Sequence, residues 1–415
     1  MKILCIMPHY HANTSANNNC MQHVIDYFKK QGHAVDIFCI DNKQGEVIEQ
    51  ENGSHIISVL DEYKMAVYKW GAKYNASQWN HLPKHISFLI KVKCFIKTVF
   101  RPKTNYYGAD AIAYRRVFRD IKQVQKHYDV VISHSFPMVS HVIADRIYKK
   151  GLADKWFAIK WDPFVYNKLD PEREVKKRQK TAERILNHSN GIFMLEGIMD
   201  ENVKNDFEPL YHQKTVNIHL PILKDRCAET KVCGAKTVMV YTGVFYSDIR
   251  RPDVMLDVLS QLPMDFELQI YGHGCQRIIE EKAKKFQEQT LKLCGRVSRK
   301  TAMEAVEKAD VLVNVGNTIS NQIPSKVFEY MSFGKPIINF YSTEEDLGLR
   351  YLKKYPLCFN FNATNYTQKD VEDLIHFCEE NKDKRLTFEE VTKDLSEHTA
   401  EAVCQKIYST IMQNI

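Results

Sequence analysis

Short apolar runs alternate with amphipathic segments along most of this chain, and that alternation restricts it to the α/β class. Residues 3–7 form an apolar run of strand length, 8–19 form a polar loop, and apolar residues in 21–28 recur at helical spacing. Gly32 ends this predicted helix, and a second strand is expected at 33–38. Strand, helix and strand in this order are typical of a parallel sheet, because the helix returns the chain to the start of the next strand.

The alternation occurs in two cycles separated by a polar segment at 224–236, which we interpret as a linker. A chain of 415 residues is too long for one ordinary core, so two domains are expected. We predict Rossmann-like domains at 1–224 and 237–397, with an amphipathic helix at 398–415 that packs back on the first domain. The predicted strands are 129–133, 156–160, 191–195, 216–220, 237–241, 267–271, 311–315 and 337–340, and the predicted helices include 139–149, 172–187, 299–308 and 326–332.

Composition is that of a globular protein, with 44% hydrophobic and 26% charged residues. The net charge of +7 is a mild excess, compatible with anionic substrates, an anionic membrane surface or an ordinary lysine-rich exterior. The 11 cysteines lack paired spacing, which favours reduced thiols in the cytoplasm. The first apolar run breaks at Pro8, too early for a signal peptide, and no uncharged stretch reaches the roughly 20 residues of a membrane span.

Three predicted strands of the second cycle end in glycine-bearing turns: Thr242-Gly243, Gly272-His273-Gly274 and Asn314-Val315-Gly316-Asn317. In open parallel sheets, ligands bind beyond the carboxyl ends of the strands. Glycines there allow close approach to the backbone and leave amides available to phosphate oxygens. Each turn alone is weak evidence, but three in one domain indicate a nucleotide site.

Residues 321–338 carry the strongest pattern, which reads Asn-Gln-Ile-Pro-Ser-Lys-Val-Phe-Glu-Tyr-Met-Ser-Phe-Gly-Lys-Pro-Ile-Ile. Pro324 is placed to begin a helix and Ser325 to supply a capping hydroxyl. Lys326 and Glu329 then share one helical face, where the lysine can meet a phosphate and the carboxylate can accept ribose hydroxyls. The alternative is a surface ion pair that contributes little.

This segment resembles the donor-site signature of retaining glycosyltransferases with the GT-B fold, the group that includes glycosyltransferase family 4. Members of its polysaccharide-building branch often read Pro-Ser-Lys-x-Phe-Glu-Tyr-Met-x-x-Gly-Lys-Pro. The order Tyr-Thr-Gly, Arg-Arg-Pro-Asp, Ile-Tyr-Gly-His-Gly, Leu-Cys-Gly-Arg-Val and Ala-Asp-Val-Leu-Val is also similar, over about 237–340. The resemblance implies two Rossmann-like domains facing across a cleft, with a nucleotide-sugar as co-substrate and neither a bound metal nor another cofactor.

Carried over by the resemblance, Glu329 binds the donor ribose and the loop from Gly295 to Val297 reads the base. Two positions depart from the family pattern. Asn321 stands where a glutamate is usual, and Val244 stands where an arginine follows the first glycine. Arg250, with Lys326 or Arg251 nearby, is expected to neutralise the diphosphate, and the donor-binding set is completed by Ser325, Gly243, Gly272 and Gly274.

The resemblance also places a histidine, His134, at the end of strand 129–133, where it would contact the donor sugar or the reacting oxygens together with Asn321 and Arg250. A packed strand-end histidine is the alternative. Asp162 either forms a turn or contacts the acceptor. The loop after the first strand lacks the family's Gly-Gly, and its Tyr10 and His11 are candidate acceptor contacts.

Residues 84–103 combine apolar positions at helical spacing with lysines and an arginine. Such a helix can lie on an anionic membrane, although an ordinary domain helix with a basic outer face has the same pattern. A peripheral position on the inner face of the membrane would suit an enzyme that extends a lipid-linked glycan.

We therefore expect a glycosyltransferase that moves a sugar, with retention, from a nucleoside-diphosphate donor to a glycan or lipid-linked acceptor in surface polysaccharide synthesis. Val244 and Asn321 motivate the alternative of a non-catalytic sugar-nucleotide-binding partner, and a GT-B sugar-nucleotide epimerase is a third possibility. A dehydrogenase is disfavoured because no GxGxxG follows the first strand. Nucleic-acid binding is disfavoured because no basic stripe lies on a known module. Sequence leaves open the donor sugar and base, the acceptor, the linkage and the oligomeric state.

Overall fold

The computed structural model describes residues 1–7, 16–39, 47–51, 53–58, 70, 73–74, 82–99, 121–122, 124–135, 138–162, 172–195, 213–227, 236–263, 265–288, 290–320 and 322–415. The chain divides into two compact units, one formed by 1–219 with 403–415 and the other by 220–402. Each unit has its own parallel sheet, which confirms the predicted pair of Rossmann-like domains.

The N-terminal unit contains an eight-stranded sheet in the order β3-β4-β2-β1-β5-β6-β7-β8. All neighbouring strands in it are parallel except β3 and β4. Its strands are β1 (Lys2–Met7), β2 (Ala34–Cys39), β3 (Val47–Glu51), β4 (Ser54–Ser58), β5 (Tyr128–Ser135), β6 (Ala153–Lys160), β7 (Gly191–Leu195) and β8 (Thr215–Ile218), and its helices are α1 (Ala16–Lys30), α3 (Lys84–Val99), α5 (Val139–Lys149) and α6 (Glu172–Leu186).

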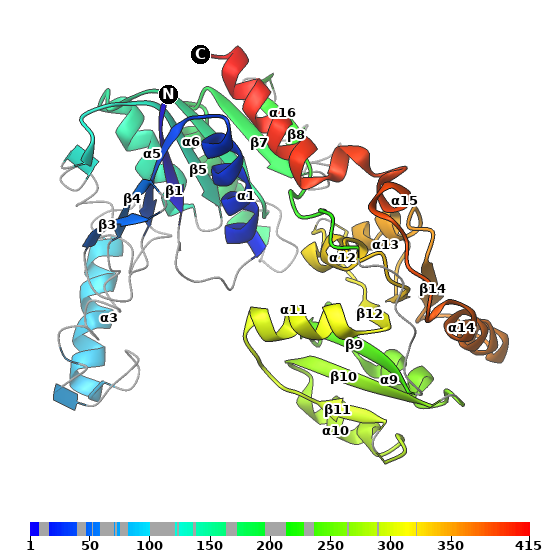
Figure 1. Cartoon of the computed structure of the whole chain (residues 1–415). Helices are drawn as coiled ribbons and strands as arrows, with labels where there is room; N and C mark the ends of the chain where they lie inside the picture. Colours follow the sequence, from blue (N-terminus) through cyan, green and yellow to red (C-terminus); the bar gives the residue numbers. More distant parts are fainter. Residues whose placement is uncertain are drawn as a thin grey trace. The chain divides into compact units, whose positions relative to one another are not determined.

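The C-terminal unit contains a six-stranded parallel sheet in the order β11-β10-β9-β12-β13-β14. In Figure 1, α11 lies on one side of the β9 to β11 part of the sheet and α9 and α10 lie on the other. Its strands are β9 (Thr237–Val244), β10 (Phe266–His273), β11 (Leu291–Leu293), β12 (Val311–Val315), β13 (Ile337–Tyr341) and β14 (Cys358–Asn362), and its helices are α9 (Asp253–Leu259), α10 (Gln276–Ala283), α11 (Arg299–Lys308), α12 (Ser325–Met331), α13 (Leu347–Leu352), α14 (Gln368–Asn381), α15 (Phe388–Thr392) and the short 3-10 turn η4 (Ser396–His398).

The C-terminal helix, α16 (Ala400–Gln413), returns to the N-terminal unit. The ring of Tyr408 packs against Phe28 of α1 with 5.3 Å between ring centroids, and it also contacts His33. Val403, Cys404, Ile407 and Ile411 form its buried stripe. The predicted return of this helix to the first domain is therefore confirmed.

Two local predictions were wrong. The last four residues of the loop predicted at 8–19 belong to α1, which begins at Ala16, and Asn17 there donates a side-chain hydrogen bond to Asp162; residues 8–15 lie outside the described residues. Strands β9 and β10 continue through the glycines that were predicted to be turns, so that Gly243 pairs with Gly272 inside the ladder. The residue types at these positions predicted a loop and a turn. In the structure, Asn17 is paired with a distant side chain and the glycines are paired between two strands.

A buried lysine fastens α11 to the C-terminal sheet. Lys335 lies two residues before β13, and its ammonium donates to the carbonyls of Val306, at 2.9 Å, and Ala309, at 2.6 Å, and also to that of Glu307. The last carbonyls of a helix have no intrahelical partner, and a cation suits the negative helix end. Lys335 is only 3% exposed, so these carbonyls depend on it.

We expect Lys335→Met to lower the free energy of unfolding by about 2–4 kcal/mol, because three carbonyls, two of them in buried hydrogen bonds, lose a charged donor. Urea unfolding of the full chain measures this. Lys308→Met, at an exposed position in the last turn of α11, is the matched control and should change the value by less than about 0.5 kcal/mol. Equal effects of the two substitutions would contradict this role of Lys335.

Candidate functional site

The carboxyl ends of β9 and β10 are packed so closely that only glycine fits. A Cβ at Gly272 would lie 1.8 Å from the carbonyl oxygen of Gly243, and one at Gly274 would lie 2.0 Å from that of Phe245. Gly243 has a φ of +133°, and a Cβ there would lie 1.9 Å from the Lys326 Nζ. These glycines therefore allow close packing of backbone and side chains at the edge where ligands of parallel sheets bind.

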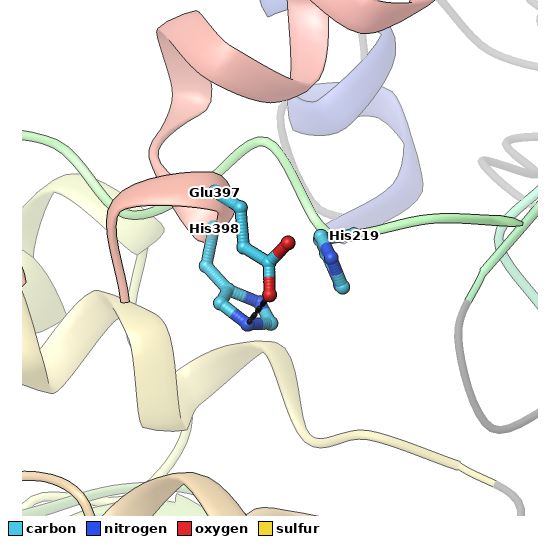
Figure 2. A group of neighbouring side chains, drawn as sticks. All are labelled: His219, Glu397 and His398. Atoms are coloured by element: carbon cyan, nitrogen blue, oxygen red, sulfur yellow. Dashed lines mark ion pairs between the residues drawn. The ribbon is translucent and has the colours of Figure 1, made fainter. Parts of the chain in front are cut away.

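Helix α12 is fixed against this edge. The Thr242 amide donates a 2.9 Å hydrogen bond to the Tyr330 hydroxyl, which joins the helix to β9. On another part of its surface, the ring of Phe328 stacks on His398 of η4 at 5.8 Å and packs against Tyr351 of α13. Figure 2 shows His398 beside Glu397, whose carboxylate lies 3.7 Å from the imidazole; His219, also drawn, ends the first of the two chain segments that form the N-terminal unit. Fixed packing of this kind orients the side chains on α12.

Helix α12 begins at Ser325 with Pro324 as its N-cap, and no side chain caps it. The prediction that Ser325 supplies a capping hydroxyl was wrong, because Ser325 occupies the first helical position and not the cap. Lys326 and Glu329 nevertheless both extend from α12, and their charges interact.

Lys326 is the unusual group of this unit. Its Nζ is buried, has no hydrogen-bond partner among the described residues, and lies 4.6 Å from the centre of the Tyr241 ring. Burial lowers the pKa of Lys326 well below its ordinary value, and the nearby Arg250 lowers it further, although Glu329 acts in the opposite direction. An unpaired buried cation is costly, so an anion that reached Lys326 would be strongly favoured.

Arg250 supplies the second cation. Its Nη2 donates a 2.7 Å hydrogen bond to Asn317 Oδ1, whereas its Nε is buried without a hydrogen-bond partner. The backbone amide of Asn317 in turn donates to the Asp346 carboxylate at 3.3 Å, and that carboxylate also accepts from the backbone amide of Gly348. Burial raises the pKa of Asp346 to about 6, against opposing effects of these amides and of Arg250. A hydrogen-bonded chain thus orients the Arg250 guanidinium beside Lys326.

Glu329 is 8% exposed and forms an ion pair with Arg299, the first residue of α11. Ser298 precedes Arg299 and caps α11 by accepting a hydrogen bond from the Thr301 amide. Glu329, the carboxylate that raises the pKa of Lys326, is therefore already paired with another cation. The Lys326–Arg250 pair keeps an excess of positive charge.

The structure places the other predicted donor residues differently. Arg251 lies on the exterior, 60% exposed, and pairs with Asp253 at 2.8 Å, so it does not add its charge to Lys326 and Arg250. Gly295 adopts a φ of +65°, and with Val297 it forms the loop between β11 and α11. Asn321, Tyr10 and His11 lie outside the described residues, and their predicted roles remain predictions.

In the N-terminal unit, β5 and β6 bring several polar side chains into the interior near their carboxyl ends. His134, on β5, is fully buried. The neighbouring Ser133 hydroxyl lies 2.8 Å from His141 Nδ1 of α5 and accepts a 2.8 Å hydrogen bond from Trp156 Nε1. Because Trp156 can only donate, the Ser133 proton is available to His141 Nδ1. Burial, followed by the charges of Lys160 and His134, lowers the pKa of His141 well below its ordinary value.

Two further titratable groups lie at the end of β6. Burial lowers the pKa of Lys160 to about 8. Burial also raises the pKa of Asp162, and the hydrogen bond from Asn17 partly opposes this shift. Asp162 thus receives a side-chain partner from α1, a contact that sequence reasoning did not anticipate.

A separate group of potential metal ligands lies at the opposite, amino-terminal edge of this sheet. Within the described part of the chain, ligand atoms of His127, Asp129 and Asp154 lie within 4.8 Å of one another. The His127 imidazole is 3.2 Å from Asp154, and the Lys2 amide donates to Asp129 at 2.7 Å. The contact between His127 and Asp154 and the hydrogen bond to Asp129 explain why these three side chains lie close together.

Sequence reasoning missed Arg299, Asn317, Asp346, His141 and Lys160. Arg299 directly follows Ser298, and serine is a residue type that often caps helices. This pattern is typical of a helix start, but it does not reveal the partner of Arg299. Asn317 belongs to a glycine turn that was already singled out. The other three carry no local signal, since the residues around them in sequence do not reveal which side chain each one meets.

Comparison with known proteins gives one family match in sequence and many matches in fold. Residues 236–346 match the family described as Glycosyl transferases group 1, which covers the strands, α11 and α12 of the site just described. No curated protein sequence matches the chain.

Solved structures resemble the chain over nearly its whole length at low sequence identity. TarM has a TM-score of 0.61 at 12% identity, with 98% of each chain covered. The Anabaena protein Alr3699/HepE, in complex with UDP and glucose, has a TM-score of 0.57 at 10% identity, with all of both chains covered. The lipopolysaccharide outer core galactosyltransferase WaaB has a TM-score of 0.53 at 15% identity, again with all of both chains covered. At these identities the likeness establishes the fold, two Rossmann-like units of the GT-B type.

Proposed function

We propose that this chain is a GT-B glycosyltransferase that takes a sugar from a nucleoside-diphosphate donor bound in its C-terminal unit. The observation that carries the proposal is the buried, unpartnered Lys326 ammonium beside Arg250 at the carboxyl edge of the sheet. The match of 236–346 to group 1 glycosyltransferases and the UDP and glucose bound by Alr3699/HepE support the same ligand class.

The two cations have a clear role in sugar transfer. When the bond between sugar and diphosphate breaks, negative charge grows on the leaving diphosphate. Cations already held in place stabilise that charge without reorganising during the reaction. Lys326 is held by α12, and Arg250 is held by Asn317. Both can also form charge-assisted hydrogen bonds to phosphate oxygens.

The family resemblance supports the remaining donor contacts that we propose. Glu329 accepts the ribose hydroxyls, and the loop from Gly295 to Val297 reads the base. His134 is the residue that the resemblance assigns to the donor sugar. The reaction proceeds with retention, without a bound metal, and with a glycan or lipid-linked acceptor in surface polysaccharide synthesis. The name of WaaB, a lipopolysaccharide galactosyltransferase, supports an acceptor of this class.

Helix α3 supports a lipid-linked acceptor. Ile86 packs with Leu82, whereas Phe88 and Leu89 are 64% and 63% exposed. Exposed lysines lie on the same helix, at 84, 91 and 93. Apolar side chains beside basic ones suit the surface of an anionic bilayer. No helix in the described part of the chain has both the length and the apolar character for a membrane crossing. We propose that the enzyme works at the inner face of the membrane through α3.

A non-catalytic sugar-nucleotide-binding protein is the second candidate. It is favoured by Val244, which ends β9 where the family pattern has an arginine. Such a protein would bind the nucleotide but would release no diphosphate when supplied with acceptors.

The donor site is tested first by thermal unfolding with a panel of nucleoside diphosphates. A ligand that binds only the native state raises its stability, by about 2.7 kcal/mol at 100 times Kd. We expect one diphosphate to raise the Tm of the wild type, and Glu329→Ala to reduce the shift strongly. Glu304→Ala, at an exposed position on α11, is the control and should keep the full shift. The absence of a shift with every diphosphate would refute the proposed donor site.

Proton uptake tests Lys326 itself. The pKa of Lys326 is lowered in the free protein and should rise when an anion binds. At a pH between these two pKa values, below 10.5, binding therefore takes up protons, and in that range the affinity falls as the pH rises. At about pH 8.5 the ligand phosphates, whose second pKa is about 6, are fully ionised. Calorimetry in buffers of different ionisation enthalpy should detect uptake in the wild type and in Lys300→Met but not in Lys326→Met. Equal uptake in all three proteins would assign the proton to another group.

Membrane association is tested with vesicles. We expect the full-length protein to sediment with phosphatidylglycerol vesicles and not with phosphatidylcholine vesicles. The double variant Phe88→Ser/Leu89→Ser should lose most of this binding, because it removes the apolar contact. Met412→Ser, an exposed apolar position on α16, is the matched control. Unchanged binding of the double variant would exclude α3 as the contact.

A further inference from the structure

Arg299 has no role in the donor site described so far, yet it forms the ion pair with Glu329. Its Nη2 donates to Glu329 Oε1. Arg299 comes from the first position of α11 and Glu329 from α12, so the pair joins two elements that are separated by β12. The Arg299 side chain is 34% exposed, whereas the Glu329 side chain is 10% exposed. The carboxylate is thus the buried partner, and the arginine approaches it from the more open side.

The second carboxylate oxygen is left available. Among the described residues, Glu329 Oε1 takes the hydrogen bond from Arg299 and no other hydrogen bond to this carboxylate is formed. Arg226 contributes a second positive charge near Glu329. Burial lowers the pKa of Arg226, and the charge of Glu329 opposes this shift. An ionised carboxylate accepts several hydrogen bonds, so Oε2 can accept from a ligand while Oε1 remains with Arg299.

A flexible glutamate would recognise ribose poorly. A free glutamate side chain samples several rotamers, and fixing one of them on binding costs about 0.5–1.5 kcal/mol. A guanidinium fixes the plane of a carboxylate better than an ammonium can, because its donors form a rigid planar fork. Both residues are also held by their helices, Arg299 next to the Ser298 cap and Glu329 within the buried face of α12. The arrangement is therefore organised before a ligand arrives.

We propose that Arg299 is a positioning residue for ribose recognition: it holds the Glu329 carboxylate so that Oε2 accepts the ribose hydroxyls of the donor, without touching the ribose itself. This inference rests on the proposed donor site and names the part of the ligand that Arg299 controls. It implies that the loss of Arg299 weakens binding only when the ligand has ribose hydroxyls to offer.

The test is a comparison of two ligands in matched variants. The ligands are the nucleoside diphosphate that stabilises the wild type and its 2′,3′-dideoxy analogue, and Kd is measured for each by calorimetry with the full-length protein. In the wild type we expect the ribose ligand to bind more tightly. Arg299→Met should weaken the ribose ligand about tenfold, which corresponds to about 1.4 kcal/mol, and should change the dideoxy ligand less than about twofold. Glu329→Gln should show the same selectivity for the ribose ligand.

Lys300→Met is the matched control. Lys300 is the next residue of α11, is exposed, and carries the same charge, so its substitution removes one positive charge from the same helix end without breaking the Glu329 pair. We expect it to change both Kd values equally and by less than about twofold, as a surface charge does. Unliganded Tm values verify folding, and Arg299→Lys, which keeps the charge but loses the planar fork, should give an intermediate loss for the ribose ligand.

Three outcomes would overturn the inference. Equal weakening of both ligands by Arg299→Met would show that the arginine acts on the diphosphate or on the fold. No weakening of either ligand would show that Glu329 needs no positioning. Equal Kd values of the wild type for the ribose ligand and its dideoxy analogue would refute the contact with the ribose hydroxyls. If the wild type bound no nucleoside diphosphate, the proposed function would fail first, and thermal unfolding detects that separately.

Discussion

The candidate site of the C-terminal unit depends on one costly placement: the Lys326 side chain is buried near the Arg250 guanidinium and has no hydrogen-bond partner among the described residues. Burial lowers the pKa of Lys326, and the charge of Arg250 lowers it further. Such an arrangement persists only where the surrounding structure fixes both side chains. Under the proposed function, an anion that contacts Lys326 would offset this cost.

The surrounding packing provides that fixation. Tyr330 joins α12 to β9 through the Thr242 amide, and Phe328 packs against His398 and Tyr351. Lys335 secures the end of α11. These contacts explain why a seven-residue helix with no side-chain cap can hold a lysine and a glutamate in definite positions. Rigid elements position a binding site more accurately than loops do, so we expect the donor site to be largely preformed.

Much of the fold could be predicted because strands and helices leave periodic apolar patterns. Helix α5 was predicted with its observed bounds, 139–149, since its apolar residues recur at helical spacing between two strands. Boundaries governed by polar residues were predicted less well. The start of α1 was missed because Asn17 lies in an asparagine-rich segment, and its partner, Asp162, is 145 residues away in sequence. Local pattern does not contain such a contact.

For the site, the sequence by itself determined which residue types stand at the ends of the strands and on α12: the glycines at 243, 272 and 274, Lys326 and Glu329. Spacing and backbone chemistry suffice for that, because parallel strands present their carboxyl ends at one edge. Only the tertiary structure decided which charges compensate each other. Arg251, adjacent to Arg250, pairs with Asp253 on the exterior, whereas Arg299 pairs with Glu329. Lys326 has no hydrogen-bond partner in the part of the chain that the structure describes. Ion pairing and desolvation depend on distances between atoms far apart in the chain, and those distances exist only once the sheet and its helices have packed.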